Sequence, residues 1–169
     1  MTALDGLRVV ELGGEIAAPY ATKLLADLGA HVVKVEPPAG DPLRHWSPFP
    51  DDEYTGALFA YLNGGKGSAV VDLDSQPGRA WLDATLDGAD LLVEGLGAGA
   101  FEASGLDVTA RRGSDPPLAT VRISPFGQTG PYVGRPTSGL VLQALGAWVS
   151  SHGVPGMDPV QVGARIHEY

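Results

Sequence analysis

The chain has 169 residues, a net charge of −9 and no cysteine, and 44% of its residues are hydrophobic. This length fits one domain of ordinary size, and the hydrophobic content is too high for a disordered chain. An acidic chain lacks the basic face that nucleic acids require, and without cysteine it forms neither disulfides nor thiolate metal sites. There is no signal-peptide pattern and no apolar run of the ~18 residues that span a membrane. We therefore expect a cytoplasmic protein with no nucleic-acid or membrane partner.

The first segments predict a βαβ unit. Residues 7–12 form a short, β-branched apolar run that ends at Gly13 and Gly14, as in a strand buried on both faces. Apolar residues at helical spacing over 17–28 predict a helix, and residues 31–36 predict a second strand that stops at two prolines. Crossovers of this kind are right-handed, so the two strands are expected to be parallel.

The same alternation of strands and helices continues along the chain. A polar loop over 39–56 precedes a short predicted helix over 57–62, and Ser75 is expected to cap a further helix with a proline in its first turn. Three more strands are predicted over 68–73, 91–94 and 118–124, a helix over 140–149 and a loop over 150–163.

This order of elements predicts an α/β fold, with a Rossmann-like open parallel sheet and helices on both of its faces. In such sheets ligands bind at the carboxyl ends of the strands. The loops that begin at Gly13, Pro37, Gly95 and Pro125 are therefore the candidate ligand-binding loops.

Two patterns could carry chemistry, and a third, the histidines, is excluded. Gly13 and Gly14 before a helix, with Glu36 at the end of the second strand, partly match a dinucleotide fingerprint. The G-x-G-x-x-G spacing is missing, and Glu15 would place negative charge beside a pyrophosphate, so redox chemistry on a dinucleotide is the weaker alternative. The four histidines show no ligand spacing, and no metal site is expected. Lys66 lies in a glycine-rich turn, where an ammonium can meet a phosphate.

A series of segments carries a joint pattern: residues 4–12 (LDGLRVVEL), 24–30 (LLADLGA), 33–38 (VKVEPP), 40–44 (GDPLR), 62–66 (LNGGK), 71–73 (VDL), 89–94 (ADLLVE) and 123–132 (ISPFGQTGPY). Together they resemble the class III CoA-transferases, the family of formyl-CoA transferase, carnitine CoA-transferase and α-methylacyl-CoA racemase. The resemblance covers nearly the whole chain.

The resemblance implies that residues 1–169 form the N-terminal CoA-binding part of a large domain. It further implies a small domain and a returning C-terminal segment that this chain lacks, and two chains interlocked as rings. We therefore expect a homodimer or a heteromer with a chain that supplies the missing segments. In the family, an aspartate attacks the acyl-CoA thioester in a ping-pong reaction through a mixed anhydride and an enzyme–CoA thioester. The substrates are acyl-CoA and a carboxylic acid, and no tightly bound cofactor is implied.

Aligning residues 163–168 on the segment that carries this aspartate places Glu168 at the nucleophile's position. Glutamate keeps the carboxylate but adds one methylene, which moves the nucleophile by about an ångström, a displacement that can lower the rate about a hundredfold. The positions that match the CoA site of the family are Ile16, Ala17, Ala18, Arg44, Lys66, Val71, Gly95, Leu96, Ala100 and Thr137.

The chain departs from the family at several positions. Pro37 and Ala103 stand where formyl-CoA transferase has arginines, and Thr137 and Ser138 stand in place of its lysine and tyrosine. Each lost charge-assisted bond weakens the hold on the CoA phosphates. Ser138 also replaces the acid–base histidine of the racemase branch, and a serine cannot exchange a proton with an α-carbon. The alternative is a non-catalytic family member that acts as a CoA-binding or architectural subunit.

Overall fold

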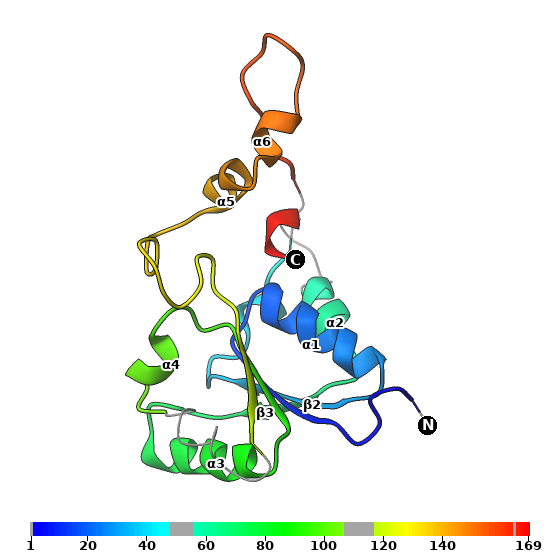
Figure 1. Ribbon diagram of the computed structural model, residues 1–169. Helices are drawn as coiled ribbons and strands as arrows, with labels where there is room; N and C mark the ends of the chain where they lie inside the picture. Colours follow the sequence, from blue (N-terminus) through cyan, green and yellow to red (C-terminus); the bar gives the residue numbers. More distant parts are fainter. Residues whose placement is uncertain (1, 48–55, 107–116, 164) are drawn as a thin grey trace.

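The computed structural model describes residues 2–47, 56–106, 117–163 and 165–169. Five parallel strands form one sheet in the order β3-β2-β1-β4-β5 (Figure 1). The strands are β1 (Arg8–Leu12), β2 (His31–Glu36), β3 (Gly67–Val70), β4 (Leu91–Glu94) and β5 (Ala119–Arg122). The predicted α/β fold is confirmed, and the third and fifth strands are shorter than the predicted ranges.

Helices cover both faces of the sheet (Figure 1). On one face lie α1 (Ala17–Asp27) and α2 (Ala57–Asn63), and on the other lie α3 (Gln76–Asp87) and α4 (Ala100–Ala103). Ser75 caps α3 by accepting a bond from the backbone N–H of Gly78, as its position before Pro77 predicts. α4 was not predicted; it lies just after the glycine-rich turn that follows β4.

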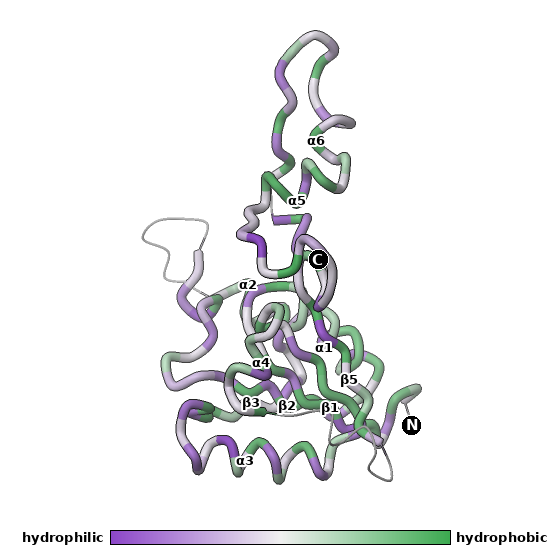
Figure 2. The backbone as a smooth tube through the Cα atoms, turned by 60° about the vertical axis from the view of Figure 1, so that its left-hand side comes forward, coloured by the Kyte–Doolittle hydropathy of each residue, from purple (hydrophilic) through white to green (hydrophobic). Residues whose placement is uncertain are grey.

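The core is divided by the sheet into two layers because successive strand residues point to opposite faces. Val10 and Leu12 of β1 pack with Leu82 and Leu86 of α3, whereas Val9 packs toward α1. Figure 2 shows α3 alternating between hydrophilic and hydrophobic residues, as expected of a helix with one face on the sheet and one in water.

A third segment rises away from the sheet (Figure 1). It contains α5 (Gly139–Leu145) and α6 (Trp148–Ser151), and the chain then returns to a 3-10 turn, η3 (Ile166–Glu168), beside α5. The single helix predicted over 140–149 is wrong. The helix ends at Leu145 with Gly146 as its C-cap, and Ala147 adopts a left-handed conformation with φ 62°, which an α-helix cannot contain. The predicted loop over 150–163 overlaps the last two residues of α6, Ser150 and Ser151.

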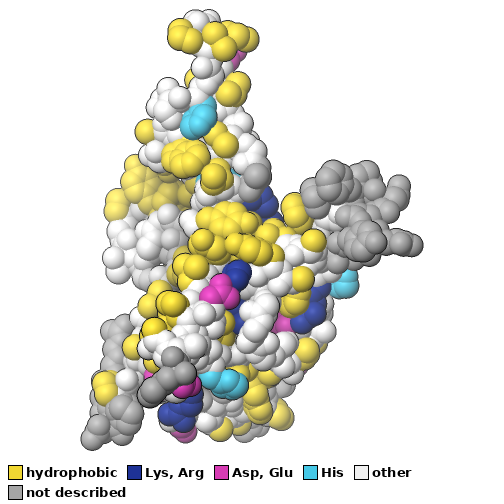
Figure 3. Space-filling view, turned by 90° about the vertical axis from the view of Figure 1, so that its right-hand side faces the viewer, with side chains coloured by type: hydrophobic (Ala, Val, Ile, Leu, Met, Phe, Trp, Pro, Cys, Tyr) yellow, Lys and Arg dark blue, Asp and Glu magenta, His cyan; other side chains and the backbone are white. Residues whose placement is uncertain are grey.

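Apolar side chains are exposed on this rising segment, and Figure 3 shows them gathered on its surface. They are Leu140, Leu145, Trp148, Val154, Met157 and Val160, each with more than 40% of its surface exposed.

The predicted loop over 39–56 contains a 3-10 turn, η1 (Pro42–Arg44), and its residues 48–55 lie outside the described residues. No helix within the described ranges is long and apolar enough to cross a membrane.

Candidate active site

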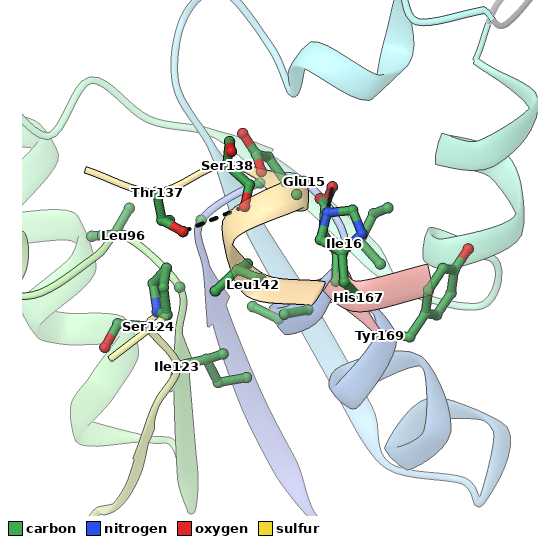
Figure 4. Close-up of a pocket in the computed structure, with 18 of the residues that line it drawn as sticks. Glu15, Ile16, Leu96, Ile123, Ser124, Thr137, Ser138, Leu142, His167 and Tyr169 are labelled. Atoms are coloured by element: carbon green, nitrogen blue, oxygen red, sulfur yellow. Dashed lines mark hydrogen bonds and ion pairs between the residues drawn. The ribbon is translucent and has the colours of Figure 1, made fainter. Parts of the chain in front are cut away.

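A cavity of about 710 Å³ lies at the carboxyl ends of the central strands. The turns that follow β1, β4 and β5 form its base, and α5 and η3 form the opposite wall (Figure 4). The sheet order reverses between β1 and β4, and ligands bind open α/β sheets at this kind of switch point. Of the four candidate loops named from the sequence, those that begin at Gly13, Gly95 and Pro125 line this cavity, whereas Pro37 lines a smaller neighbouring cavity.

Two glycines allow the turns after β1 and β4 to approach each other. Gly13 has φ 105°, and a Cβ there would lie 2.9 Å from the carbonyl carbon of Gly95. A Cβ on Gly95 would in turn lie 2.9 Å from the Cβ of Ala18. Side chains at either position would push the first turn of α1 away from β4 and close the base of the cavity.

Glu168 lines this cavity, with 19% of its side chain exposed. Arg165 donates from Nε to Oε1 at 2.7 Å and from Nη2 to Oε2, so its guanidinium holds the carboxylate with two bonds. Nε2 of His167 lies 3.2 Å from the same Oε1. The bond to Glu168 raises the pKa of Arg165, and the glutamate therefore faces a permanent cation.

His167 is oriented by a buried amide of α5. Gln143 accepts a bond from the backbone N–H of Val162 at 2.8 Å and donates to its carbonyl oxygen at 2.9 Å, which fixes the orientation of the amide. Its Nε2 also lies 3.1 Å from Nδ1 of His167. Because an amide nitrogen only donates, Nδ1 accepts, and the neutral ring carries its proton on Nε2, toward Glu168.

Gly139, the first residue of α5, permits this arrangement. A Cβ at this position would collide with the imidazole ring of His167. Gln143 and Gly139 thus hold the ring against α5, and His167 in turn contacts the carboxylate. Arg165 (φ 53°) and Glu15 (φ 63°), which lie 3.5 Å apart at their side chains, both adopt the strained left-handed conformation.

Lys66 does not reach the cavity. Its side chain is 1% exposed, and its Nζ donates to Glu11, Thr22, Asn63 and the carbonyl of Pro19 at 2.8–3.0 Å. Burial lowers its pKa. The expected contact between this ammonium and a phosphate is not supported, because the tertiary structure commits the ammonium to the interior between β1, α1 and α2.

A second buried cation, Lys34 of β2, stabilises the turn that follows β1. Lys34 Nζ lies 2.7 Å from Glu11 and 2.8 Å from Asp41, and it donates to the carbonyl of Gly13 at 3.1 Å. These buried ion pairs, together with the bond to the Gly13 carbonyl, hold in place the turn after β1 that lines the cavity.

Arg44 is also engaged within the chain. It donates from Nε and Nη2 to the two oxygens of Glu36, each at 2.7 Å, and its guanidinium lies over the ring of Phe59. Ser68 and the backbone N–H of Asp41 complete the donor set, and the pKa of Glu36 falls to about 2, chiefly because of Arg44. With 39% of its side chain exposed, Arg44 is more accessible than Lys66, but the described contacts do not place it at the cavity.

The remaining predicted residues fall into two groups. Ile16, Ala17, Ala18, Gly95, Leu96, Thr137 and Glu168 line the large cavity. Val71 and Ala100 line a neighbouring cavity of about 370 Å³, which shares Leu96 with the first. This smaller cavity is acidic, with Glu36, Asp41, Asp72 and Asp74 among its lining residues. Within the described part of the chain, no group of three potential ligands is suited to a metal ion.

Three residues of this site were missed from the sequence. His167 was treated only as one of four histidines without ligand spacing, Arg165 lies in the aligned segment 163–168 but was given no role, and Gln143 was not singled out. The one available signal was Gln143, a polar residue in an otherwise apolar helical segment, which is typical of a buried amide with a specific partner.

Comparisons with known proteins decide the family. The family model for CoA-transferase family III matches residues 4–169. The chain belongs to this family. It is similar to the succinyl-CoA–D-citramalate CoA-transferase of Chloroflexus aurantiacus, with 36% identity over 96% of this chain and 40% of that protein. Similarity also extends to subunit BbsE of the succinyl-CoA:(R)-benzylsuccinate CoA-transferase of Thauera aromatica, with 37% identity over 91% of this chain and 38% of that protein.

Among solved structures, a CAIB/BAIF family protein from Brucella suis matches with a TM-score of 0.88 and 36% identity, over 99% of this chain and 45% of that one. The chain thus spans about 40% of the length of these family III relatives. The predicted family and fold are confirmed. The family is one of transferases that use CoA thioesters as substrates.

Proposed function

We propose that this chain supplies the nucleophile and one wall of the CoA site of an acyl-CoA:carboxylate CoA-transferase. The observation that carries the proposal is the position of Glu168 on the wall of the switch-point cavity, in a chain of CoA-transferase family III. A carboxylate nucleophile must be ionised and poorly solvated. Arg165 donates two bonds to the charged form, Nε2 of His167 lies 3.2 Å from Oε1, and only 19% of the Glu168 side chain is exposed.

The proposed reaction is ping-pong. The Glu168 carboxylate attacks the thioester carbon of acyl-CoA, the C–S bond breaks, and a mixed anhydride and CoA thiolate form. The thiolate then attacks the Glu168 carbonyl carbon, which releases the first carboxylate and leaves Glu168 as a CoA thioester. The second carboxylate attacks that thioester, and the released thiolate finally takes the new acyl group and restores Glu168. Atoms and charge balance without any further reactant.

The rest of the CoA site and the acyl pocket are proposed to come from outside this chain. The chain spans about 40% of its relatives, and one of them is named as a subunit. The exposed apolar residues of the rising segment support a covering partner, either a second copy in an interlocked homodimer or a different chain. A cytoplasmic location is part of the proposal.

CoA itself is proposed to lie along the rim formed by Ile16, Ala18, Gly95 and Leu96, with Val71 and Ala100 at the smaller cavity. Since Lys66 is paired with Glu11 and the guanidinium of Arg44 with Glu36, the CoA phosphates would have to bind other cations or remain hydrated. We therefore propose weak CoA binding by this chain alone.

The test is to trap the intermediate on Glu168. The protein, together with any partner that co-purifies with it, is incubated with succinyl-CoA and then treated with hydroxylamine or borohydride. Peptide mass spectrometry should find a hydroxamate or an alcohol at Glu168, and Glu168→Gln is the matched control without a nucleophile. No adduct in a sample that binds CoA would reject the nucleophile.

A second candidate is a CoA-binding or architectural subunit without catalysis. It is favoured by one observation, the two-bond engagement of Glu168 by Arg165, which opposes attack on a thioester. CoA binding without any Glu168 adduct, in the presence of a complete partner, would select this candidate.

A further inference from the structure

Arg165 holds the proposed nucleophile directly. Its guanidinium contacts both oxygens of Glu168 and lies 3.5 Å from one oxygen of Glu15, and both glutamates line the large cavity. The side chain is 30% exposed, and the ring of Trp46 lies 6.0 Å from its central carbon. The Nε–Nη2 edge of the planar Arg165 guanidinium thus binds the Glu168 carboxylate at the edge of the cavity.

The proposed reaction removes this partner's charge. When Glu168 becomes an anhydride or a CoA thioester, its side chain is neutral and no longer pairs with a cation. Among the described residues, Arg165 then keeps one anionic neighbour, Glu15, whose 3.5 Å approach is longer than an ordinary hydrogen bond. A guanidinium fork is therefore released beside the carbon that the incoming carboxylate must attack.

We propose that Arg165 is the carboxylate-binding residue of the reaction, which holds Glu168 in the resting state and the carboxylate substrate once Glu168 is acylated. This inference rests on the proposed function, because the exchange is triggered by acylation. The acceptor's two oxygens take the places of Oε1 and Oε2 on the fork, so the attacking oxygen lies within a few ångströms of the Glu168 carbonyl carbon. The same site receives the carboxylate released in the first half-reaction.

The exchange of carboxylates on Arg165 also explains how Glu168 can be bound by Arg165 at rest and still react as a nucleophile. An arginine that held only the nucleophile would weaken it, whereas an arginine shared between two carboxylates prevents both from occupying the site at once. Glu15 limits the site to one carboxylate group, since a second negative charge near Nη2 would lie beside its side chain. The ligand class is therefore an organic acid bound by one carboxylate end.

The experiment needs no turnover. Glu168→Gln imitates the neutral, acylated side chain and releases the fork, and Glu168→Met serves as a second neutral variant. Succinate is titrated into each purified variant and into the unchanged protein at constant ionic strength, with chloride as the anion control, and binding is followed by calorimetry. Succinate should bind the neutral variants on the order of tenfold more tightly than the unchanged protein, as expected when the released guanidinium forms one charge-assisted hydrogen bond to succinate.

The double variant Glu168→Gln/Arg165→Gln should bind succinate no more tightly than the unchanged protein. Glu168→Gln/Arg135→Gln should keep the tighter binding, because Arg135 is exposed, lies over Tyr132 and does not line the large cavity. Circular dichroism checks that each variant is folded. Equal succinate affinity in the unchanged protein and both folded neutral variants, or tighter binding that survives Arg165→Gln, overturns the inference. Failure to trap an adduct on Glu168 would instead reject the proposed function, so the two failures are distinguishable.

Discussion

The strongest quantitative prediction concerns Glu36, which ends β2 beside the smaller cavity. Its side chain is 1% exposed and accepts bonds from Arg44, Ser68 and the backbone of Asp41. These donors favour the charged form and lower its pKa from 4.5 to about 2. At about 1.4 kcal/mol for each pH unit, this difference corresponds to about 3 kcal/mol of unfolding free energy. Because the Arg44 side chain is 39% exposed and water screens its share, we expect about 2–3 kcal/mol, an order-of-magnitude figure.

A lowered carboxyl pKa stabilises the folded state above the unfolded value, and that stability is lost as the pH falls from about 4.5 toward 2. Glu36→Gln should therefore lower the unfolding free energy at pH 7 by about 2–3 kcal/mol, and the gap to the unchanged protein should close as the pH approaches 2. Urea unfolding followed by tryptophan fluorescence at a series of pH values measures both. Asp5→Asn, an exposed carboxylate, is the control and should run parallel to the unchanged protein. A Glu36→Gln profile that also runs parallel would refute the reasoning.

Three further predictions follow from single contacts. Gly13→Ala should lower the unfolding free energy by about 1–3 kcal/mol through backbone strain alone, because φ is 105° and the new Cβ meets Gly95. Gly67→Ala, where a Cβ makes only ordinary contacts, is the control and should lower the unfolding free energy less in the same urea titration. Lys66→Met should lower it by about 3–5 kcal/mol because Glu11 loses a buried partner, and an unchanged urea midpoint would contradict this. In nitrogen-15 spectra the neutral His167 ring should carry its proton on Nε2, and Gln143→Leu should weaken that preference because Nδ1 loses its donor while Glu168 remains beside Nε2. A proton on Nδ1 in the unchanged protein would contradict the assigned bond.

The sheet was predictable because its strands are encoded locally. Residues 7–12 and 31–36 are short β-branched runs bounded by glycine or proline, a pattern typical of strands buried on both faces of a parallel sheet. The break in the helix predicted over 140–149 was not predictable. The apolar density of this segment suits a continuous helix, but a left-handed residue at Ala147 breaks it, and the break brings the following segment back toward the cavity.

The site was predictable only in part, for a related reason. Turns such as residues 13–18 follow parallel strands directly, so they could be named as candidate ligand-binding loops before the strand order was known. The partner of a charged side chain depends on residues far away in the chain. Lys66 meets Glu11 across 55 positions, and no local pattern near Lys66 shows that its ammonium is internal.

The amino-acid sequence by itself determined the fold class and the family, because periodicity, turn residues and family motifs are all readable from short segments of the chain. The tertiary structure alone decided which charges are available for chemistry. Folding buried Lys34 and Lys66 against Glu11, committed the Arg44 fork to Glu36, and placed Arg165 and His167 on Glu168. An ion pair is made by whichever groups the packed chain brings within a few ångströms, and that distance is a property of the whole fold.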